Sequence, residues 1–497
     1  MHEYLAAIDQ GTTGTRCILF TLDGRIASSA YREHRQIFPQ PGWVEHDPLE
    51  ILSRTAEVVS EARVSAPSGR VLGVGVTNQR ETVVAWDAQT GRPLFNALVW
   101  QDTRTEPDCR ALVEAGLEGD VRARTGLPIS TYFSATKMRW LLTHVPEARE
   151  LARSSRLRLG TIDTWLIWNL TGGAFVTDPT NASRTLLFNL AALDWDAALI
   201  DRFDIPRGAL PEIRPSASRE PYGATRADGP FGAAVPICGD LGDQQAALLG
   251  QACFAPGETK NTYGTGSFLL QHVGASPVAS RHGLLTTAAC SIGGGRAYAL
   301  EGSVAITGAA VQWLRDNLGL IGSAAETEAI AASVPDAGGV YFVPAFSGLF
   351  APHWDMRAAG VIVGLTRFAT KAHLVRATLE AIAFQSREVV DAMAADSGHR
   401  VSTLKVDGGA TCNDLLMQLQ ADVLGVPVVR PAVRETTALG AAYAAGLGLK
   451  IYASPEELAR LWRADRTFEP AWPASRREEA LRAWSRAVDR ARNWHPA

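Results

Sequence analysis

The fold is decided by the opening stretch of the chain, Tyr4–Phe20, which reads Tyr-Leu-Ala-Ala-Ile-Asp-Gln-Gly-Thr-Thr-Gly-Thr-Arg-Cys-Ile-Leu-Phe. The apolar run 4–8 predicts a buried strand, and a second apolar run starts at Cys17. Glycines in the intervening turn lack a Cβ, so backbone N–H groups and threonine hydroxyls can approach an anion closely. The stretch predicts either a phosphate-binding hairpin, in which Asp9 orients a Mg²⁺ ion through water, or an ordinary turn.

A similar stretch, 260–270, lies far downstream and reads Lys-Asn-Thr-Tyr-Gly-Thr-Gly-Ser-Phe-Leu-Leu. It again predicts a strand, a Gly/Thr turn and a strand. Two such hairpins in one chain of 497 residues predict a duplicated domain with a nucleotide between the copies. Pro256 and Gly257 mark the expected crossover, so we place the two domains at residues 1–252 and 253–497.

Composition excludes several classes of protein. The net charge is −4, from 48 basic and 52 acidic residues, and no basic patch predicts nucleic-acid binding. No apolar run approaches the ~20 residues that a membrane span needs. The six cysteines are scattered without a C-x-x-C pair, which favours free thiols in a reducing cytoplasm. The sequence contains neither a P-loop motif nor a G-x-S-x-G motif.

Charged and aromatic residues follow the predicted strands of the first half. A third strand is expected at 25–32, and the buried strand 71–76 is followed by adjacent Arg80 and Glu81. Ligands of α/β proteins bind at such strand ends, although a surface ion pair is the alternative. Trp100, at the end of another predicted strand, suits either the core or a ligand platform. The polar loop 178–184 suggests no chemistry by itself.

Asp243 stands where a strand gives way to a helix, directly after Gly242. Aspartate is favoured as a helix N-cap, and the local sequence favours this interpretation. The alternative is a general base near a substrate hydroxyl, and the two roles are compatible.

The second half contains three predicted helices that bear on a site. Helix 305–318 has Gly308 near its start and Gln312 one turn later, which suggests close approach by a ligand or by another helix. Helix 370–396 carries an apolar stripe and belongs to the core. A Gly-Gly turn that ends in Gly409 precedes a helix 414–424, which we expect to be capped by Asn413 and stopped at Gly425. Those glycines allow a flat or charged group to lie at the helix N-terminus.

Taken in order, the motifs closely resemble those of the glycerol kinases, which are carbohydrate kinases with the actin- and hexokinase-like ATPase fold. The resemblance covers about residues 4–448. It implies an α/β protein of two duplicated actin-like (ribonuclease H-like) domains with a deep cleft between them. The matching motifs are Asp9-Gln-Gly-Thr-Thr13, Asn78-Gln-Arg-Glu-Thr82, Trp100-Gln101, Gly242-Asp-Gln-Gln-Ala-Ala247, Asn261-Thr-Tyr-Gly-Thr-Gly266, Val406-Asp-Gly-Gly409 and Thr437-Ala-Leu-Gly-Ala-Ala442.

The resemblance implies phosphoryl transfer from ATP to glycerol, with Asp243 as the general base. Hydroxyl groups need both donors and acceptors, which suits the expected hydrogen-bonding residues Arg80, Glu81, Tyr132, Asp243 and Gln244. Trp100 and Phe268 are expected to form an apolar wall, and Asp9 and Asp243 are the carboxylates nearest to Mg²⁺. The residues expected to hold the nucleotide are Thr12, Thr13, Gly14, Arg16, Thr265, Gly308, Gln312, Gly409 and Asn413.

The sequence also departs from the family pattern. Gly14 stands where a serine hydroxyl is usual, so one phosphate contact is expected to be lost or moved. Ala234 replaces an arginine of the loop through which fructose 1,6-bisphosphate inhibits some members, so we expect that inhibition to be absent. The resemblance implies a homodimer or homotetramer. The alternatives are a sister kinase for erythritol or xylulose, and a non-catalytic ATPase of the same fold.

Overall fold

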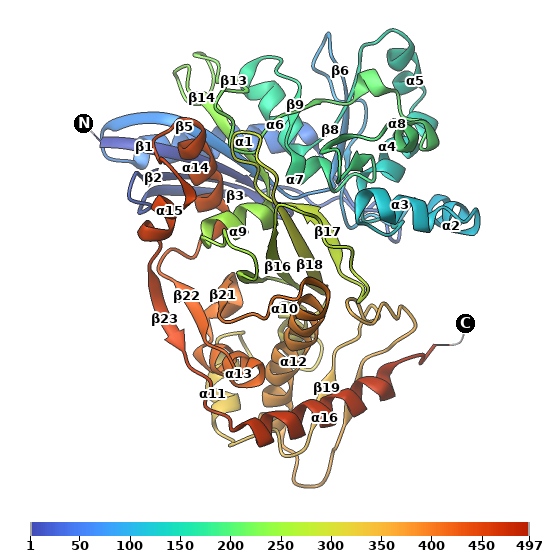
Figure 1. Cartoon of the computed structure of the whole chain (residues 1–497), viewed down its shortest axis with the longest axis vertical. Helices are drawn as coiled ribbons and strands as arrows, with labels where there is room; N and C mark the ends of the chain where they lie inside the picture. Colours follow the sequence, from blue (N-terminus) through green and yellow to red (C-terminus); the bar gives the residue numbers. More distant parts are fainter. Residues whose placement is uncertain (1, 496–497) are drawn as a thin grey trace.

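The computed structural model describes residues 2–495 and contains two mixed β-sheets, one in each half of the chain (Figure 1). The first sheet has the order β13-β14-β5-β1-β2-β3. Strands β1, β2 and β3 form an antiparallel meander, and β5 and β14 run parallel to β1. The bounds are β1 His2–Gln10, β2 Gly14–Thr21, β3 Ile26–Glu33, β5 Gly69–Asn78, β13 Gly223–Ala224 and β14 Pro236–Gly242. The three strands expected at the N-terminus and the buried strand 71–76 are confirmed.

The second sheet repeats this arrangement. Strands β15, β16 and β18 form an antiparallel meander, and β21 and β22 continue from β15 in parallel. Strands β17 and β23 extend the two edges. The bounds are β15 Thr259–Tyr263, β16 Ser267–Gly274, β17 Leu285–Ala288, β18 Tyr298–Val304, β21 Leu404–Asp407, β22 Val428–Pro431 and β23 Ala464–Phe468. The equal order and direction of five central strands in each sheet agree with the predicted duplication.

Two helices from different halves pack together on the first sheet. Helix α9, Asp243–Gly250, lies against α14, Thr436–Gly448, which returns from the second half (Figure 1). Glycines make this approach possible, since a Cβ on Gly440 would lie 1.8 Å from the carbonyl oxygen of Ala246. The small residues of α14 therefore allow the two helices to pack closely.

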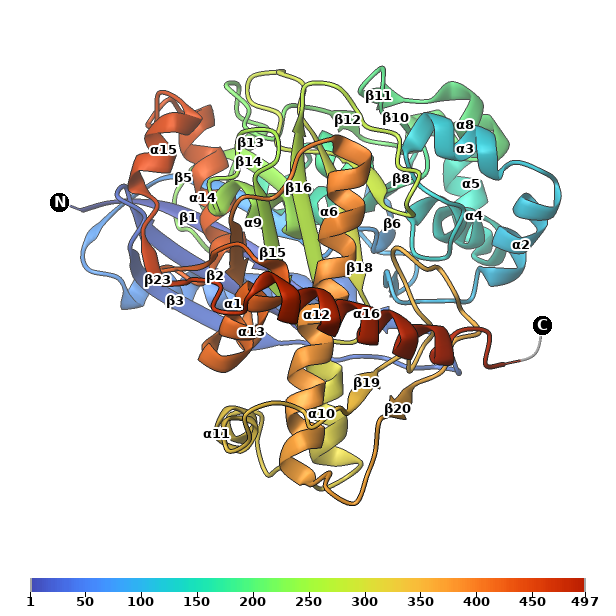
Figure 2. The same ribbon diagram turned by 60° about the horizontal axis from the view of Figure 1, so that its bottom comes forward.

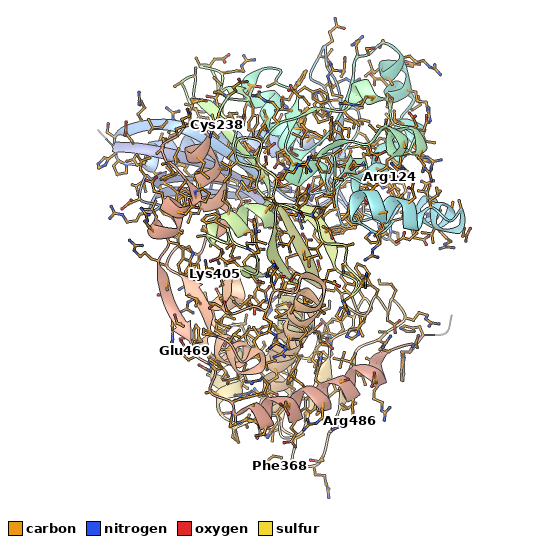
Figure 3. The ribbon with its side chains drawn as sticks, in the orientation of Figure 1. Arg124, Cys238, Phe368, Lys405, Glu469 and Arg486 are labelled. Atoms are coloured by element: carbon orange, nitrogen blue, oxygen red, sulfur yellow. The ribbon has the colours of Figure 1, made fainter. Side chains whose placement is uncertain are left out.

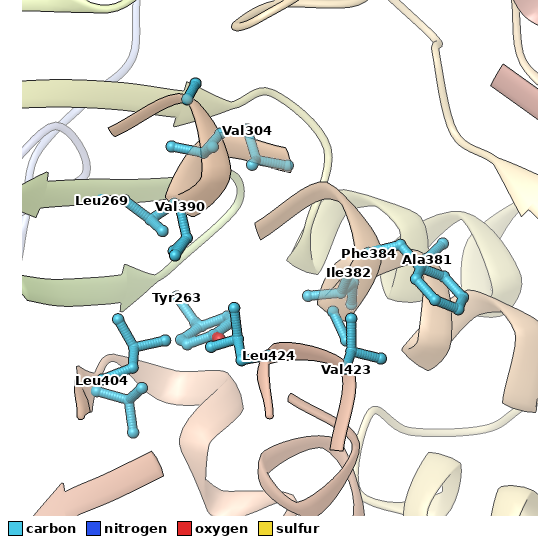
Figure 4. Packing of buried hydrophobic residues seen from close by; sticks show 14 of the residues in the cluster. Tyr263, Leu269, Val304, Ala381, Ile382, Phe384, Val390, Leu404, Val423 and Leu424 are labelled. Atoms are coloured by element: carbon cyan, nitrogen blue, oxygen red, sulfur yellow. The ribbon is translucent and has the colours of Figure 1, made fainter. Parts of the chain in front are cut away.

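Helix α12, Lys371–Ser397, is the main support of the second sheet, and α16, Ala474–Ala491, crosses near it (Figure 2). Ile382 of α12 and Tyr263 of β15 belong to one buried apolar cluster, with Leu404 and Val423 (Figure 4). The predicted core helix 370–396 is confirmed, and its N-terminus is closed by a capping box between Thr370 and His373.

The segments between β3 and β5 and between β5 and β14 build a separate layer beside the first sheet. It holds the four-stranded sheet β4-β7-β6-β8 and a group of helices, upper right in Figure 1. The strands of this sheet are β4 Glu45–His46, β6 Val83–Asp87, β7 Ala97–Leu98 and β8 Leu157–Thr161. The helices from α1 to α8 are α1 Pro48–Ser65, α2 Glu106–Glu114, α3 Glu118–Thr125, α4 Ser134–His144, α5 Pro146–Arg153, α6 Ile162–Thr171, α7 Pro179–Ala182 and α8 Ala197–Arg202.

The remaining elements are short or lie at the periphery of the second half. They are β9 Val176–Thr177, β10 Phe188–Asn189, β11 Asp194–Trp195, β12 Glu212–Ile213, β19 Tyr341–Val343, β20 Val361–Val363, α10 Gly308–Asp316, α11 Glu326–Ala332, α13 Asp414–Leu424, α15 Pro455–Leu461, η1 Arg207–Ala209 and η2 Gly409–Cys412.

Side chains also connect the two halves where the chain crosses. Lys405 of β21, labelled in Figure 3, donates hydrogen bonds to the carbonyl oxygens of Gln251 and Ala252 at 2.8 and 3.0 Å. These carbonyls follow the end of α9, so the second sheet supports that helix from behind. Within residues 2–495, every helix is too short or too polar to cross a membrane. The domain boundary after residue 252 stays a prediction.

Candidate active site

The β1–β2 hairpin has the predicted shape. The Gly11 N–H donates to the Gly14 carbonyl at 2.9 Å and closes the turn. Gly14 has no room for a side chain, because a Cβ there would lie 2.6 Å from the carbonyl oxygen of Arg32. Thr12 accepts a hydrogen bond from the Trp100 indole at 2.9 Å, which ties the turn to one wall of the candidate site. Arg16 forms an ion pair with Glu435, the residue that precedes α14.

Asp9 lies at the end of β1, where its carboxylate is only partly accessible. Burial raises its pKa from 3.8 to about 7, against the opposing effect of Arg16, and the charges of Asp243 and Glu435 add to the increase. Two acidic side chains therefore interact across the site, and a cation between them would relieve their repulsion. Mg²⁺ commonly binds one or two carboxylates while water and phosphate oxygens complete its shell. This donor set fits that ion.

The raised pKa of Asp9 makes a prediction about stability. The unfolded chain gives up this proton near pH 4 and the folded chain near pH 7, so stability falls as pH rises between these values. Above pH 7 we expect the unfolding free energy of Asp9→Asn to exceed that of the wild type by up to about 4 kcal/mol. The variant should therefore unfold at a higher temperature. The gain should vanish below pH 4. Thermal unfolding of both proteins from pH 3.5 to 8.5 measures it, and equal curves would contradict the assignment.

Arg80 is the centre of a buried charge cluster. Its guanidinium donates to both carboxylate oxygens of Glu301, at 2.5 and 3.0 Å. Its Nε lies 3.1 Å from an oxygen of Asp243, and its Nη1 donates to the Gln245 side chain at 3.2 Å. Burial acts against the charge of Glu301, but Arg184 and Arg80 outweigh it and lower its pKa to about 2. The surface ion pair considered as an alternative for Arg80 is therefore wrong, because its side chain is 2% exposed.

Glu81 faces the same cluster from an unusual backbone conformation. Its φ is +64°, a left-handed geometry that costs of the order of 1 kcal/mol or more for a residue with a side chain. Arg184 donates to one oxygen of its carboxylate at 2.6 Å and also contacts Glu301 at 3.2 Å. Such strain persists only where the surroundings hold it, and here two guanidiniums flank the carboxylate.

Asp243 is the first residue of α9 and not its cap. The cap position is Gly242, and the helix N–H that donates to the Asp243 side chain is that of the adjacent Gln244, at 2.7 Å. The expected capping role of Asp243 was therefore wrong, because its carboxylate forms an ion pair with Arg80 instead of capping the helix. Burial raises the pKa of Asp243, while Arg80 and Lys260 act in the opposite direction. Its side chain remains 29% exposed, whereas those of Arg80 and Glu301 are 2% and 0% exposed, so Asp243 is the more accessible group of the three.

Tyr132 lies beside the charge cluster, with the Arg184 guanidinium 5.4 Å from the centre of its ring. Trp100 and Tyr132 form an edge-to-face pair with ring centroids 5.5 Å apart. Lys260, fully buried on β15, donates to the Gln244 side chain and, at 3.2 Å, to the carbonyl of Phe268. Burial lowers the pKa of Lys260 to about 8. Lys260 thus joins the predicted residues of the two halves, Gln244 and Phe268.

A cavity of about 500 Å³ lies beside the second hairpin. All five residues expected there for the nucleotide line it, namely Thr265, Gly308, Gln312, Gly409 and Asn413. Asn413 caps α13 through the Leu416 N–H, and that helix has the expected bounds and stop at Gly425. Arg315, Thr327, Glu328 and Cys412 also line the cavity, although no sequence motif marks them.

Gly308 differs from its predicted setting. It is the first residue of α10, which spans Gly308–Asp316 and is shorter than the expected helix 305–318. Its N–H donates to the carbonyl of Gly264 at 3.1 Å, and a Cβ would lie 2.7 Å from that oxygen. The tip of the hairpin therefore rests on the start of α10. Thr12, Thr13, Gly14 and Arg16 belong to the opposite hairpin and do not line this cavity.

Gly409 offers a direct test of the cavity. A Cβ built there meets no atom within 4 Å and its φ is not positive, so a larger residue folds without strain and projects into free space. We expect Gly409→Val to raise the KM for ATP about tenfold or more, because steric overlap with the nucleotide should cost about 1–3 kcal/mol of binding free energy. The melting temperature and the KM for the second substrate should not change. Gly208→Val is the control, because Gly208 is equally open and sits in a similar short helix away from the cavity. Equal KM values for ATP in both variants would contradict the assignment.

Comparison with known proteins places the chain. The N-terminal domain model of the FGGY family of carbohydrate kinases matches residues 4–250, and the C-terminal domain model matches residues 259–449. The chain belongs to the FGGY family. This FGGY chain is 54% identical to a glycerol kinase of Beijerinckia indica subsp. indica over 99% of both chains. It is 55% identical to a glycerol kinase of Mycobacterium tuberculosis over 99% of this chain and 96% of that one.

The structural comparison agrees. The crystal structure of Plasmodium falciparum glycerol kinase with ADP superimposes on the FGGY chain with a TM-score of 0.93. The sequence identity is 38%, and the alignment covers 99% of this chain and 98% of that one. The predicted fold class, two duplicated actin-like domains, is thereby confirmed.

Proposed function

We propose that this FGGY kinase transfers the γ-phosphoryl group of ATP to a terminal hydroxyl of glycerol and forms sn-glycerol 3-phosphate. The observation that carries the proposal is the partly exposed Asp243 carboxylate held by Arg80, together with a separate cavity of about 500 Å³ in the second half. The glycerol kinases of Beijerinckia indica and Mycobacterium tuberculosis, similar over almost the whole chain, support glycerol as the acceptor. The ADP in the Plasmodium falciparum structure supports an adenine nucleotide as the donor.

Glycerol binding uses complementary donors and acceptors. Arg80 supplies N–H donors, and Glu81 supplies carboxylate acceptors. Lys260 donates to the Gln244 oxygen, so the Gln244 amide N–H₂ is left to donate to a substrate oxygen. Trp100, Tyr132 and Phe268 bound the carbon chain, and their bulk keeps the pocket small. A three-carbon polyol matches this combination better than a ketose of five carbons does.

Asp243 accepts the proton of the attacking hydroxyl. A general base is most effective when its pKa lies near the working pH, and burial moves Asp243 in that direction. Arg80 keeps its carboxylate in place while leaving part of it open to the substrate. The hydroxyl oxygen then attacks the γ-phosphorus in line with the departing ADP oxygen.

The two hairpins hold the phosphates from opposite halves. Backbone N–H groups of the first turn, together with Thr12, Thr13 and Arg16, face the site from one half, and Thr265 does so from the other. Asp9 and Asp243 are the residues that would hold Mg²⁺, which neutralises phosphate charge when bound. Enclosure between the halves excludes water, which otherwise competes as the acceptor. The six cysteines are free thiols, which supports a reducing cytoplasm as the location.

The test is ADP release by the purified protein with ATP and Mg²⁺ in the presence of glycerol, dihydroxyacetone, erythritol, xylulose or no acceptor. We expect the highest kcat/KM with glycerol. A preference for erythritol or xylulose would move the substrate assignment to a sister kinase. ADP release that does not depend on any acceptor would refute the kinase proposal and leave an ATPase of the same fold.

A further inference from the structure

The polar loop that showed no chemistry in the sequence is completely buried beside the site. It comprises Asp178 and the residues through Arg184, and contains the short helix α7, which lies against β14 and β17 (Figure 1). The side chains of Asp178, Thr180 and Asn181 are fully inaccessible. Buried polar groups are costly unless hydrogen-bonded, so their partners reveal what the loop does.

The loop forms hydrogen bonds with several of the strands and charged residues around the candidate site. Asn181 accepts from the Asn78 side chain at 3.0 Å, at the end of β5 and two residues before Arg80. Ser183 and Thr287 of β17 share a hydrogen bond of 2.9 Å. Arg184 contacts Glu81 and Glu301, as described above. One short segment thus holds groups from both halves of the chain.

Thr180 makes the contact closest to Asp243. The N–H of Gly242 donates to the Thr180 hydroxyl at 2.8 Å, and that hydroxyl donates to Asp178 at 2.9 Å. A carboxylate only accepts, so the hydroxyl hydrogen points to Asp178 and a lone pair faces the amide. Gly242 is fixed from its other side by Arg80, since a Cβ there would lie 2.6 Å from two carbons of the Arg80 side chain.

We infer that Thr180, oriented by Asp178, is a positioning residue that fixes the start of α9 and thereby the Asp243 carboxylate. Asp178 is itself held firmly, because Ser216 donates to it at 2.6 Å and the Asn181 N–H at 2.9 Å. The Asp243 side chain makes no bond to the helix other than the adjacent amide, so its location depends on the backbone that Thr180 holds. This inference rests on the proposed function, because it assumes that Asp243 is the base.

Thr180→Val tests it, since valine keeps the shape and removes the hydroxyl. A shift of about 1 Å in a catalytic group can cost about 100-fold in rate, so we expect kcat with glycerol to fall by up to about 100-fold. The KM for ATP should not change, because the nucleotide cavity is built by the other half. Thr180→Ser restores the hydroxyl and should return kcat close to the wild-type value.

Thr185→Val is the matched control. Thr185 is equally buried in the same segment, but its hydroxyl bonds only locally, donating to the Ala182 carbonyl at 2.7 Å and accepting from the Leu187 N–H. We expect a similar loss of melting temperature with kcat retained. Equal kcat in the two valine variants, or no rescue by serine, would overturn the inference.

Two further outcomes are distinguishable. If Thr180→Val does not fold, Asp178→Asn is the second variant. It keeps the shape of the carboxylate but replaces one acceptor oxygen with a donor N–H₂, so at least two donors lose their acceptor. The same loss of kcat at unchanged KM for ATP is expected. An unchanged kcat in that variant would overturn the inference. If the wild type itself releases no ADP with glycerol, the proposed function fails, whereas an active wild type with an active Thr180→Val refutes only the positioning role.

Discussion

Asp243→Asn should reduce kcat for glycerol by about 10²–10⁴-fold, the usual contribution of a general base. Asparagine has the same shape and can still accept a hydrogen bond from Arg80, but it cannot take the proton of the attacking hydroxyl. Glycerol binding, measured by calorimetry without ATP, should change little. Steady-state ADP release over a range of glycerol concentrations gives kcat, and a value near that of the wild type would remove the base assignment.

Asp240→Asn provides the control for that experiment. Asp240 lies three residues earlier on β14 and is fully buried. Burial raises its pKa well above its usual range, and the neighbouring carboxylates of Asp163 and Asp178 raise it further. Burial and the neighbouring carboxylates therefore favour the neutral acid form of Asp240, so exchange for a neutral amide of the same shape should leave kcat unchanged. Comparing Asp243→Asn with Asp240→Asn therefore distinguishes the loss of the general base from the loss of any nearby acidic residue.

Arg80→Ala should affect both stability and glycerol recognition. It leaves the buried Glu301 without its bidentate partner and Asp243 without its ion pair, and breaking such a pair costs about 3–5 kcal/mol. We also expect the KM for glycerol to rise far more than the KM for ATP. Urea unfolding measures the first effect, and initial rates at fixed ATP and at fixed glycerol measure the second.

Two comparisons sharpen the interpretation of Arg80. Arg80→Lys keeps the charge but not the planar fork that matches Glu301, so it should recover only part of the stability. Arg110→Ala breaks an exposed pair with Glu106 and should change stability by no more than about 1 kcal/mol. Equal increases in both KM values for Arg80→Ala would make Arg80 a structural residue only.

Local sequence features predicted much of the fold. The turn glycines and the apolar runs on either side were sufficient for both hairpins, because each hairpin closes within a few residues. Asn413 and Gly425 marked the two ends of α13 for the same reason. The family resemblance of these turns and helix starts predicted which residues hold the nucleotide, and the five predicted on the second half line one cavity.

The partners of the charged site could not be found in this way. Glu301 lies 221 residues from Arg80, in the middle of β18, and nothing in the residues around it distinguishes it from an ordinary strand residue. Arg184, which donates to Glu81, was not predicted as a site residue because the loop around it contains no recognisable motif. The only available signal was the density of polar residues in 178–184, which the structure places entirely inside the protein.

Local preference also misled the interpretation of Asp243. Aspartate before a helix is usually a cap, but a guanidinium contributed from another strand competes for the carboxylate. At Gly308 the local pattern misplaced a helix boundary. Helix α10 begins later than predicted, because the tip of the β15–β16 hairpin occupies the space before Gly308.

Helix α14 has a consequence for how the chain can be divided. Its small residues cover Leu5, Ala7 and Ile18 of the first sheet, and Glu435 at its start holds Arg16. The earliest-synthesised sheet therefore stays uncovered on one face until nearly the whole chain has left the ribosome. A fragment ending between the halves would expose that apolar face to water, so the first half is a structural unit without being an autonomous folding unit.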